Sequence, residues 1–455
     1  MNAEIAYGRQ HLNLALPQGA RILRTAPVQP LAHPAQAVAD ALHTPIGTPP
    51  LPQIAAARRA VPSLPASGKL ETAFQAAAGR RHACIVVSDI TRPVPYRVLL
   101  PPLLAALDGV VGRITLLVAT GTHRASTQAE KLEMFGPDIV ARYPIVDHDS
   151  RDPAQVAPLP APTASGSQVS VNRLYLDADL KILTGLVEPH FMAGYSGGRK
   201  AVLPGLVDLA SIQRFHGPGF LESPRATSGV LDGNPCHREA TDAAHLAGCD
   251  FVLNVALDLD RNIIGVFAGG LDTAFAAAVA KVDSFCRATV AEPADIVVTS
   301  AGGYPLDKTF YQTVKGMVGA LPVVRQGGVV LIASACSEGI GNAEYAELMA
   351  RYHGRHEQFL RDILARDEVV QDQWEFEEQC KVLARVGVGG LVVCTNGIPR
   401  DTLDRLSVTP AATLCQAPDP EQRLQGALDA LLAARPGARV VAIPEGPYVL
   451  AGVNA

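Results

Sequence analysis

The chain has 455 residues, of which 48% are hydrophobic and 18% charged, and its formal net charge is -5. This length and composition allow two or three domains with large cores. The slightly acidic balance argues against a nucleic-acid partner or an anionic membrane surface. No uncharged apolar stretch approaches the roughly 18 residues of a membrane-spanning helix, and the N-terminus does not resemble a signal peptide, so we expect a soluble cytoplasmic protein with no membrane partner.

The eight cysteines are scattered, and no two of them form a Cys-x-x-Cys pair. This spacing argues against a zinc ribbon or an iron–sulfur motif. Cys84, Cys336 and Cys394 lie in apolar runs, and we expect them to be buried as small hydrophobic residues in a reducing compartment.

Apolar runs typical of buried strands alternate with amphipathic stretches typical of helices. The expected strands are Ala83–Val87, Arg113–Ala119, Leu174–Leu186, Asp250–Ala256, Asp295–Thr299, Gly328–Ala333, Gly390–Cys394 and Arg439–Ile443. The expected helices are Tyr96–Leu107, Ala274–Asp283, Tyr311–Leu321 and Ala343–Leu364. Such alternation with continuously apolar strands predicts an α/β protein whose sheets are largely parallel and covered on both faces.

The segment Arg287–Asp295 leaves a long helix and starts a new strand, which predicts a domain boundary there. We therefore expect two α/β domains, over residues 1–288 and 289–436. Residues 437–455 are expected to return to the first domain as a strand.

Ligands bind parallel sheets beyond the carboxyl ends of the strands, and polar residues gather at those points of the sequence. They are Asp89 and Arg92, His123, His190, and the group Gly302, Gly303 and Asp307. An Arg at a strand end suits a carboxylate because its planar fork can bind two oxygens. Asp89 and Arg92 could equally form a salt bridge within a turn.

The densest group of polar residues runs from Glu188 to Lys200, as Glu-Pro-His-Phe-Met-Ala-Gly-Tyr-Ser-Gly-Gly-Arg-Lys, and His216 follows it. Glycines between a strand and a helix let the backbone approach an anion, and the N–H groups of the helix start can hold a phosphate. The Walker pattern is absent because neither Ser nor Thr follows Lys200. The segment therefore predicts a phosphate-binding loop of another kind, flanked by His190 and His216.

Structural interpretations of the same residues stay open. His123 could be a structural histidine at a strand end, and Lys200 could be a solvated surface lysine. His216, followed by Gly217, could cap the end of a helix.

The combined order of these motifs resembles the lactate racemase family, whose members are nickel-pincer racemases and epimerases of 2-hydroxyacids. The matching elements are Asp89-Ile-Thr-Arg-Pro, Thr120-Gly-Thr-His123, the segment Glu188–Lys200, and His216. Tyr311-Gln-Thr-Val-Lys315 looks like the family's substrate-binding segment, and Tyr7–Pro17 resembles the start of family members. The resemblance spans residue 7 to beyond residue 315.

The resemblance implies a role for each matching residue. His123 and His190 correspond to the two acid/base catalysts, and His216 to the histidine that completes the nickel coordination. Lys200 corresponds to the lysine that carries the cofactor, a nickel-pincer nucleotide built on a pyridinium mononucleotide with two sulfur arms. The residues matching the loop that holds its phosphate are Tyr195, Ser196, Gly197 and Gly198. The residues matching the substrate-carboxylate site are Arg92, Gln312 and Lys315, with Asp89 orienting either Arg92 or a histidine.

These assignments imply an active-site cleft between a cofactor-binding, catalytic N-terminal domain and a C-terminal domain that contributes substrate-binding residues. Other proteins must build such a cofactor, so cofactor-biosynthesis proteins are expected partners beside the small-molecule 2-hydroxyacid. Protein from a host without them is expected to be cofactor-free.

The residue types suit the reaction that the resemblance implies. The C2 hydrogen of a 2-hydroxyacid is only weakly acidic, so hydride removal is easier than proton removal, provided that a base takes the hydroxyl proton. Inversion needs such a group on each face of the substrate, and two histidines that exchange protons near neutral pH meet this need.

Two other functions stay open on the sequence. A nicotinamide-type 2-hydroxyacid dehydrogenase would require a Gly-x-Gly-x-x-Gly turn after an early strand, and none is well placed. The second alternative is a non-catalytic relative that binds a nucleotide or nickel. Against it, a matching residue is present at every family position that we can place.

Overall fold

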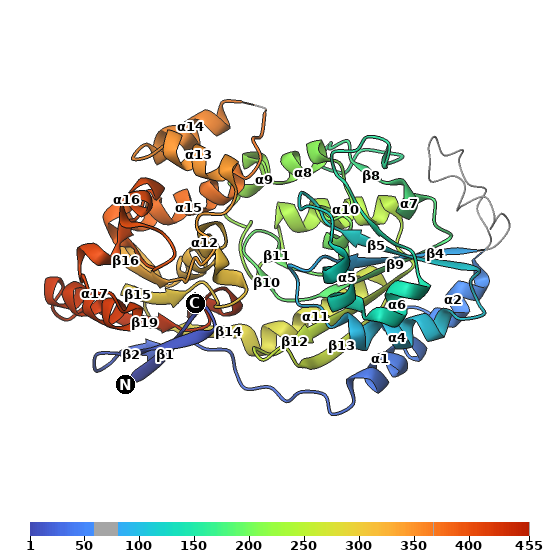
Figure 1. The fold of residues 1–455 in the computed structure, drawn as a ribbon, viewed down its shortest axis with the longest axis horizontal. Coiled ribbons are helices and arrows are strands. Elements are labelled where there is room, and N and C mark those ends of the chain that lie inside the picture. The colour runs from blue at the N-terminus through green and yellow to red at the C-terminus, as the bar shows by residue number, and fades with distance from the viewer. Residues whose placement is uncertain (59–80, 367, 455) are drawn as a thin grey trace.

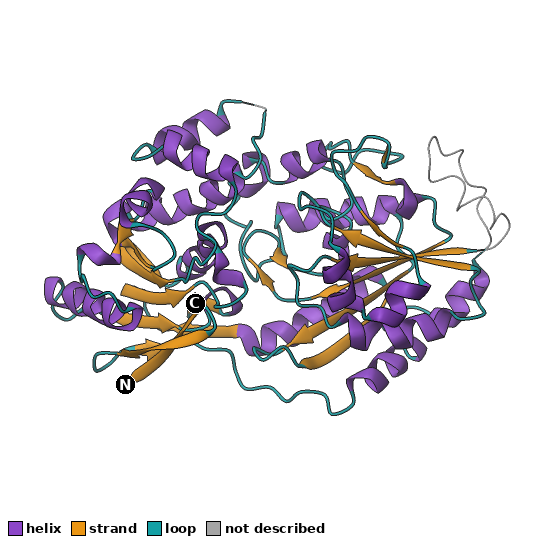
Figure 2. Cartoon of the chain, viewed as in Figure 1, coloured by secondary structure: helices purple, strands orange, loops and turns teal. Residues whose placement is uncertain are grey.

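The computed structural model describes residues 1–58, 81–366 and 368–454 (Figure 1). Two six-stranded sheets lie at its centre, with helices packed around both of them (Figure 2). The expected α/β class with largely parallel sheets is confirmed. No described helix is both long and apolar enough to cross a membrane.

The first sheet has the order β13-β12-β9-β4-β5-β6. Its strands are β4 (His82–Ser88), β5 (Arg113–Ala119), β6 (Ile145–Asp147), β9 (Leu180–Leu186), β12 (Phe251–Leu257) and β13 (Ile263–Gly269). All neighbours are parallel except β12 and β13. The central strands are buried on both faces, as their continuous apolar runs predict.

The second sheet has the order β18-β17-β16-β15-β19-β3, and all of its neighbours are parallel. Its strands are β3 (Arg21–Ile22), β15 (Ala294–Ser300), β16 (Val324–Ala333), β17 (Leu391–Cys394), β18 (Thr409–Pro410) and β19 (Val440–Ile443). The hairpin of β1 (Asn2–Tyr7) and β2 (Gln10–Ala15) buries Ile5 and Leu14 in the same cluster as Ile296 and Val298 of β15.

The expected return of residues 437–455 to the first domain is wrong for the strand Arg439–Ile443. This run forms β19, which lies between β15 and β3 in the second sheet. After it, β20 (Leu450–Val453) pairs with β14 (Arg287–Val290) in a separate two-stranded sheet. An apolar run fits either sheet equally well, so only the long-range pairing decides between them.

Two other expected elements are also corrected. The run Leu174–Leu186 begins as helix α7 (Arg173–Leu176), because the Asn172 side chain caps the helix by accepting a hydrogen bond from the N–H of Leu174 (2.9 Å). The stretch Ala343–Leu364 forms two helices, α13 (Ala343–Arg351) and α14 (His356–Leu364), with Gly354 at a φ of 67° between them.

The helices that matter for the site lie between the strands. They are α4 (Tyr96–Leu107), α8 (Leu209–Phe215), α9 (Pro218–Leu221), α11 (Leu271–Cys286), α12 (Phe310–Ala320) and α15 (Gln373–Val386). Helix α4 has the predicted bounds, whereas α15 was not predicted. The cysteines Cys84, Cys336 and Cys394 are free and buried, as expected.

Candidate active site

His123 and Asp89 follow two neighbouring strands of the first sheet. Asp89 comes directly after β4 and is only 6% exposed, and its Oδ2 lies 2.6 Å from Nδ1 of His123, which follows β5. Burial would raise the pKa of Asp89, but the hydrogen bond and the charge of His123 outweigh it and lower the pKa. A carboxylate that accepts the Nδ1 proton leaves Nε2 of His123 as the proton acceptor. Asp89 therefore orients the histidine, one of the two alternatives expected for it.

His190 and Lys200 are joined by a hydrogen bond of 2.9 Å between Nε2 and Nζ. The other ring nitrogen, Nδ1, accepts hydrogen bonds from the backbone N–H groups of Met192 (3.2 Å) and Ala193 (3.3 Å). A nitrogen that accepts two N–H groups carries no proton, so Nε2 carries the proton and donates it to Lys200. Lys200 can accept it only as a neutral amine.

The electrostatics of the site agree with this assignment. Burial is the main reason why the pKa of His190 lies well below its usual range. Burial, followed by the charges of Arg199 and Arg92, holds the pKa of Lys200 well below its usual range. A lysine in this state is a nucleophile near neutral pH.

The loop before Lys200 is held by its own backbone. β10 (Pro189–His190) and β11 (Gly194–Tyr195) form a short antiparallel hairpin, and Ser196 closes it by donating its N–H to the carbonyl oxygen of Glu188 (2.9 Å). Gly197 has a φ of 77°, and a Cβ there would meet the Val187 side chain at 2.7 Å. Only glycine fits such a position, so this approach of the loop to the strand is built into the sequence.

Three of the loop residues expected to hold a phosphate already use polar groups in hydrogen bonds within the protein. The Tyr195 hydroxyl donates to Asp283 of α11 (2.5 Å), and the Ser196 hydroxyl donates to the carbonyl oxygen of Leu186 (2.7 Å). The N–H of Gly198, at the start of a 3-10 helix, donates to Oδ1 of Asn254 (3.2 Å). In this structure these groups therefore stabilise the loop.

Arg199 is a loop residue whose importance the sequence did not reveal. It is 1% exposed, stacks over the Phe275 ring at 4.1 Å, and donates to the carbonyl oxygens of Ala193 (3.0 Å) and Tyr195 (3.1 Å). Burial lowers the pKa of Arg199 to about 9. Its charge meets carbonyl oxygens instead of a carboxylate, so it adds a positive field under the loop.

His216 ends helix α8, and its Nδ1 lies 2.9 Å from the carbonyl oxygen of Ile212. A carbonyl accepts only a proton, so Nδ1 is protonated and the lone pair of Nε2 is free for a metal. The ring packs between Phe215 and Trp374, at 4.8 Å from each ring centroid. Burial lowers the pKa of His216 to about 3, which keeps the imidazole in the neutral form that binds metals.

The second half of the chain reaches the same place through helices α12 and α15. Trp374 of α15 contacts His216, and its Nε1 donates to the Tyr311 hydroxyl of α12 (2.9 Å). One turn further along α12, Nζ of Lys315 lies 5.6 Å from the ring centroid of Phe191, beside the loop. The structure thus brings Lys315 close to the residues of the first half. The sequence does not predict that Trp374 belongs to the site, because nothing local connects it to His216.

Charged groups cluster around Lys315. Arg92 and Glu188 both lie near enough to influence its pKa, which burial lowers first. Burial raises the pKa of Glu188, and Arg92 and Lys315 oppose that rise. The amide oxygen of Gln312 is buried and accepts no hydrogen bond from the described residues. Glu188 is a neighbour of the site that the sequence identified only as the first residue of a motif.

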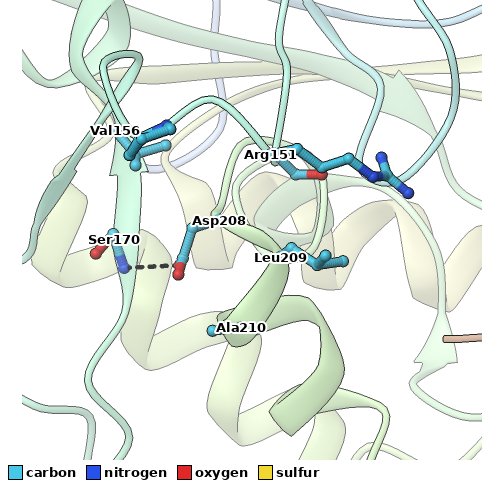
Figure 3. Close-up of a pocket in the computed structure, with 8 residues that line it drawn as sticks. Arg151, Val156, Ser170, Asp208, Leu209 and Ala210 are labelled. Atoms are coloured by element: carbon cyan, nitrogen blue, oxygen red, sulfur yellow. Dashed lines mark hydrogen bonds between the residues drawn. The ribbon is translucent and has the colours of Figure 1, made fainter. Parts of the chain in front are cut away.

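A separate surface pocket holds none of the predicted site residues (Figure 3). It is lined by Ser150, Arg151, Pro153, Val156, Ser170, Asp208, Leu209 and Ala210. Asp208 there accepts hydrogen bonds from the N–H of Ser170 (3.3 Å) and from the Ser211 hydroxyl (2.5 Å). This pocket lies at the start of α8, the helix that ends at His216.

Comparison with known proteins gives consistent results over both halves of the chain. The family model of the lactate racemase N-terminal domain matches residues 64–229, and that of the C-terminal domain matches residues 289–450. The chain is 35% identical to the lactate racemase of Thermoanaerobacterium thermosaccharolyticum over 425 residues, covering 91% of this chain and 93% of the relative. It is also 35% identical to the lactate racemase of Lactiplantibacillus plantarum over 393 residues, covering 84% and 87%.

Solved structures agree. The lactate racemase apoprotein from Thermoanaerobacterium thermosaccharolyticum superposes with a TM-score of 0.85 at 32% identity, over 99% of this chain and 100% of that one. A protein from Thermotoga maritima shares the fold, with a TM-score of 0.61 at 17% identity over 85% and 96% of the two chains. The chain is therefore a member of the lactate racemase family and, by its homology, an isomerase of the racemase type.

Proposed function

We propose that this protein inverts C2 of a 2-hydroxyacid, with lactate as the first candidate, and that the nickel-pincer nucleotide implied by its family is attached to Lys200. The observation that carries the proposal is the hydrogen bond from His190 to Lys200, which makes this lysine a neutral amine. A covalent attachment through nitrogen requires that form of the side chain.

The residues around Lys200 fit the cofactor in other respects. His216 offers one free imidazole nitrogen to a metal. Arg199 supplies a buried positive charge beneath the glycine loop, which suits a phosphate. When bound, the cofactor supplies the acceptor for the C2 hydride. Arg92, Lys315 and Gln312 are proposed to hold the substrate carboxylate.

The two histidines are proposed to handle the hydroxyl proton. His123, held by Asp89, presents an acceptor nitrogen, whereas His190 presents an N–H donor. In the proposed cycle His123 takes the hydroxyl proton of one enantiomer, and His190 returns a proton to the oxygen from its imidazolium form as the other enantiomer forms, because a neutral imidazole is too weak an acid to give up its only ring proton. The reverse direction exchanges the two roles.

The test is incubation of cofactor-loaded protein with one pure enantiomer of lactate and of other 2-hydroxyacids, without added NAD. Chiral chromatography should show the opposite enantiomer accumulating to a mixture of both. Cofactor-free protein is the matched control and should leave the enantiomer unchanged. Ketoacid formed only when NAD is added would support a dehydrogenase, and a loaded protein that inverts none of the acids would support a non-catalytic relative.

A further inference from the structure

Asp372 lies directly before helix α15 and has an unusual backbone conformation. Its φ is 65° and its ψ is 4°, in the left-handed region that residues with a side chain adopt at a cost in free energy. An Asp at the start of a helix normally caps the helix with its side chain. Asp372 makes no capping hydrogen bond to the N–H groups of α15, all of which the structure describes, although it is only 4% exposed. Its carboxylate therefore serves another purpose.

The carboxylate holds polar side chains of two neighbouring helices. Oδ1 accepts a hydrogen bond from the Tyr311 hydroxyl in the first turn of α12 (3.2 Å), and Oδ2 accepts one from Nδ2 of Asn342, the residue that caps α13 (2.5 Å). The Tyr311 hydroxyl in turn accepts the Nε1 proton of Trp374 (2.9 Å). An indole N–H can only donate, so the hydroxyl proton points to Asp372. The chain of hydrogen bonds therefore runs in one direction, from Trp374 through Tyr311 to Asp372.

This chain ends at the ring of His216. Trp374 packs against the imidazole with 4.8 Å between the ring centroids and 32° between the planes. The other ring contact of His216 is the edge of Phe215, its neighbour in the chain. The hydrogen bond from Nδ1 to the carbonyl oxygen of Ile212 fixes only one atom of the imidazole. Trp374 is thus the contact from the second half of the chain that sets the plane of the ring, and with it the direction of Nε2.

The residues just before Asp372 are bound to the first half of the chain. Gln213 of α8 donates a hydrogen bond to the carbonyl oxygen of Val369 (2.7 Å), and Arg151 donates one to Oε1 of Gln371 (2.8 Å). Asp372 therefore joins a segment that is bound to α8 to the helices α12 and α13. Its side chain is placed where a change in the second half would reach His216 through Trp374.

We propose that Asp372 is a positioning residue that fixes Tyr311 and Trp374, so that the His216 imidazole presents Nε2 to a metal in one direction. The left-handed backbone directs the Asp372 side chain to Tyr311 and Asn342 instead of to the start of α15. This inference rests on the proposed function, in which His216 binds nickel. Asp372 acts through Trp374 and does not itself bind the metal.

The first test uses cofactor-free protein, because Trp374 is the only tryptophan of the chain. Trp374 is 5% exposed, so acrylamide should quench its fluorescence poorly in the wild type. Asp372→Gly removes the carboxylate and relieves the backbone, because glycine adopts a positive φ freely. The emission of Trp374 should shift to longer wavelength and its quenching constant should rise, since the released indole becomes accessible to water.

The second test uses cofactor-loaded protein and measures how firmly the metal is held. Residues that orient a metal ligand typically contribute about 10–100-fold to metal affinity, so Asp372→Gly should lose nickel to a chelator at least about tenfold faster than wild type. Both proteins are compared at a temperature at which they are fully folded. A merely structural role of Asp372 would lower the free energy of unfolding without changing this rate.

A matched pair of tyrosine variants controls both tests. Tyr311→Phe breaks the chain one bond closer to Trp374 and should reproduce both results, and it replaces Asp372→Gly if circular dichroism shows that this variant does not fold. Tyr352→Phe removes a hydroxyl that donates to a different acid, Asp362 (2.7 Å). It should leave the fluorescence and the nickel release as in the wild type.

Wild-type nickel release from folded Asp372→Gly overturns the inference, whatever the fluorescence shows. His216→Ala separates this result from a failure of the proposed function. If His216→Ala also loses nickel no faster than wild type, His216 is not a metal ligand and the proposed assignment itself is wrong. If His216→Ala loses nickel rapidly and Asp372→Gly does not, only the role of Asp372 is rejected.

Discussion

The carboxyl edges of the two parallel sheets carry similar residue types but serve different purposes. At the second sheet, the polar side chains bond to one another and to the backbone. The Ser300 hydroxyl donates to the carbonyl oxygen of Pro444 (2.7 Å), and the hydroxyls of Ser334 and Thr313 lie 2.7 Å apart. At the first sheet, burial favours the neutral forms of Lys200 and His216, and the Nε2 lone pair of His216 is available to a ligand.

Asp307 shows the difference most clearly. Like Asp89 after β4, it follows a strand, and the sequence therefore placed it among the polar residues at strand ends. In the structure it is 1% exposed and accepts hydrogen bonds from the N–H groups of Gly8 (2.6 Å) and Ala335 (3.1 Å). It therefore ties the N-terminal hairpin to the second sheet. Both bonds end on Oδ2, and the buried Oδ1 accepts none from the described residues. A strand end is thus not enough to predict a site, because a polar side chain there can serve to join two segments of the backbone.

The largest expected effect concerns Lys200 at the carboxyl edge of the first sheet. Lys200→Met should abolish the covalent cofactor adduct in protein matured with the biosynthetic enzymes, because the nucleophilic amine is gone. The fold should remain, since Lys200 pairs with no acid among the residues that the structure describes. Intact-mass spectrometry measures the adduct. Lys308→Met is the control at the second edge, where Lys308 pairs with Glu338. Retention of the adduct in Lys200→Met would contradict the assignment.

The next largest effect concerns the paired histidines. His123→Ala and His190→Ala should each slow racemisation in both directions by about 10²–10⁴-fold, because the cycle needs both groups. The exposed His11 on β2 provides the control, and His11→Ala should racemise at the wild-type rate. Rates from chiral chromatography, starting from each enantiomer, check this. Near wild-type rates in both histidine variants would mean that the two residues are structural.

Asp307 tests the carboxyl edge of the second sheet, where a substitution should change stability and not activity. Asp307→Ala leaves the N–H groups of Gly8 and Ala335 without their acceptor. The free energy of unfolding should fall by about 1–3 kcal/mol. Urea unfolding measures it, and racemase activity per folded molecule should stay within about twofold of wild type. A large loss of activity in a stable Asp307→Ala protein would break the comparison between the two edges.

The smallest effect concerns His82, at the opposite end of β4 from Asp89. Burial lowers the pKa of His82 to about 4, and its Nε2 lies 3.0 Å from the Thr115 hydroxyl. At pH values below the ordinary histidine pKa of about 6.5, His82 binds a proton in the unfolded chain but not in the folded chain. The free energy of unfolding therefore decreases as pH falls toward 4. Between pH 7 and 5.5 the loss should be about 1 kcal/mol smaller in His82→Gln than in wild type. Urea unfolding at both pH values checks it, and equal losses would contradict the neutral, buried state of His82.

The sequence alone determined several of the local elements. Helix α4 and strand β5 have the predicted bounds, because buried apolar residues recur every three to four positions in α4 and form a continuous run in β5. The glycines and the lysine of the loop before Lys200 were also visible, since a loop that turns with a positive φ needs glycine at defined positions. The family resemblance came from the order of such short motifs, and it is confirmed.

Only the tertiary structure decided the partners. Asp89 could have oriented Arg92 or a histidine, and it bonds to His123, 34 residues away. Trp374 reaches His216, and the final apolar strand joins the second sheet instead of the first. The physical reason is that a side chain's type and spacing set its local conformation, whereas its pKa and free hydrogen-bonding groups depend on neighbours brought together by packing. The reactivity of Lys200 depends on such neighbours, so only the tertiary structure shows it.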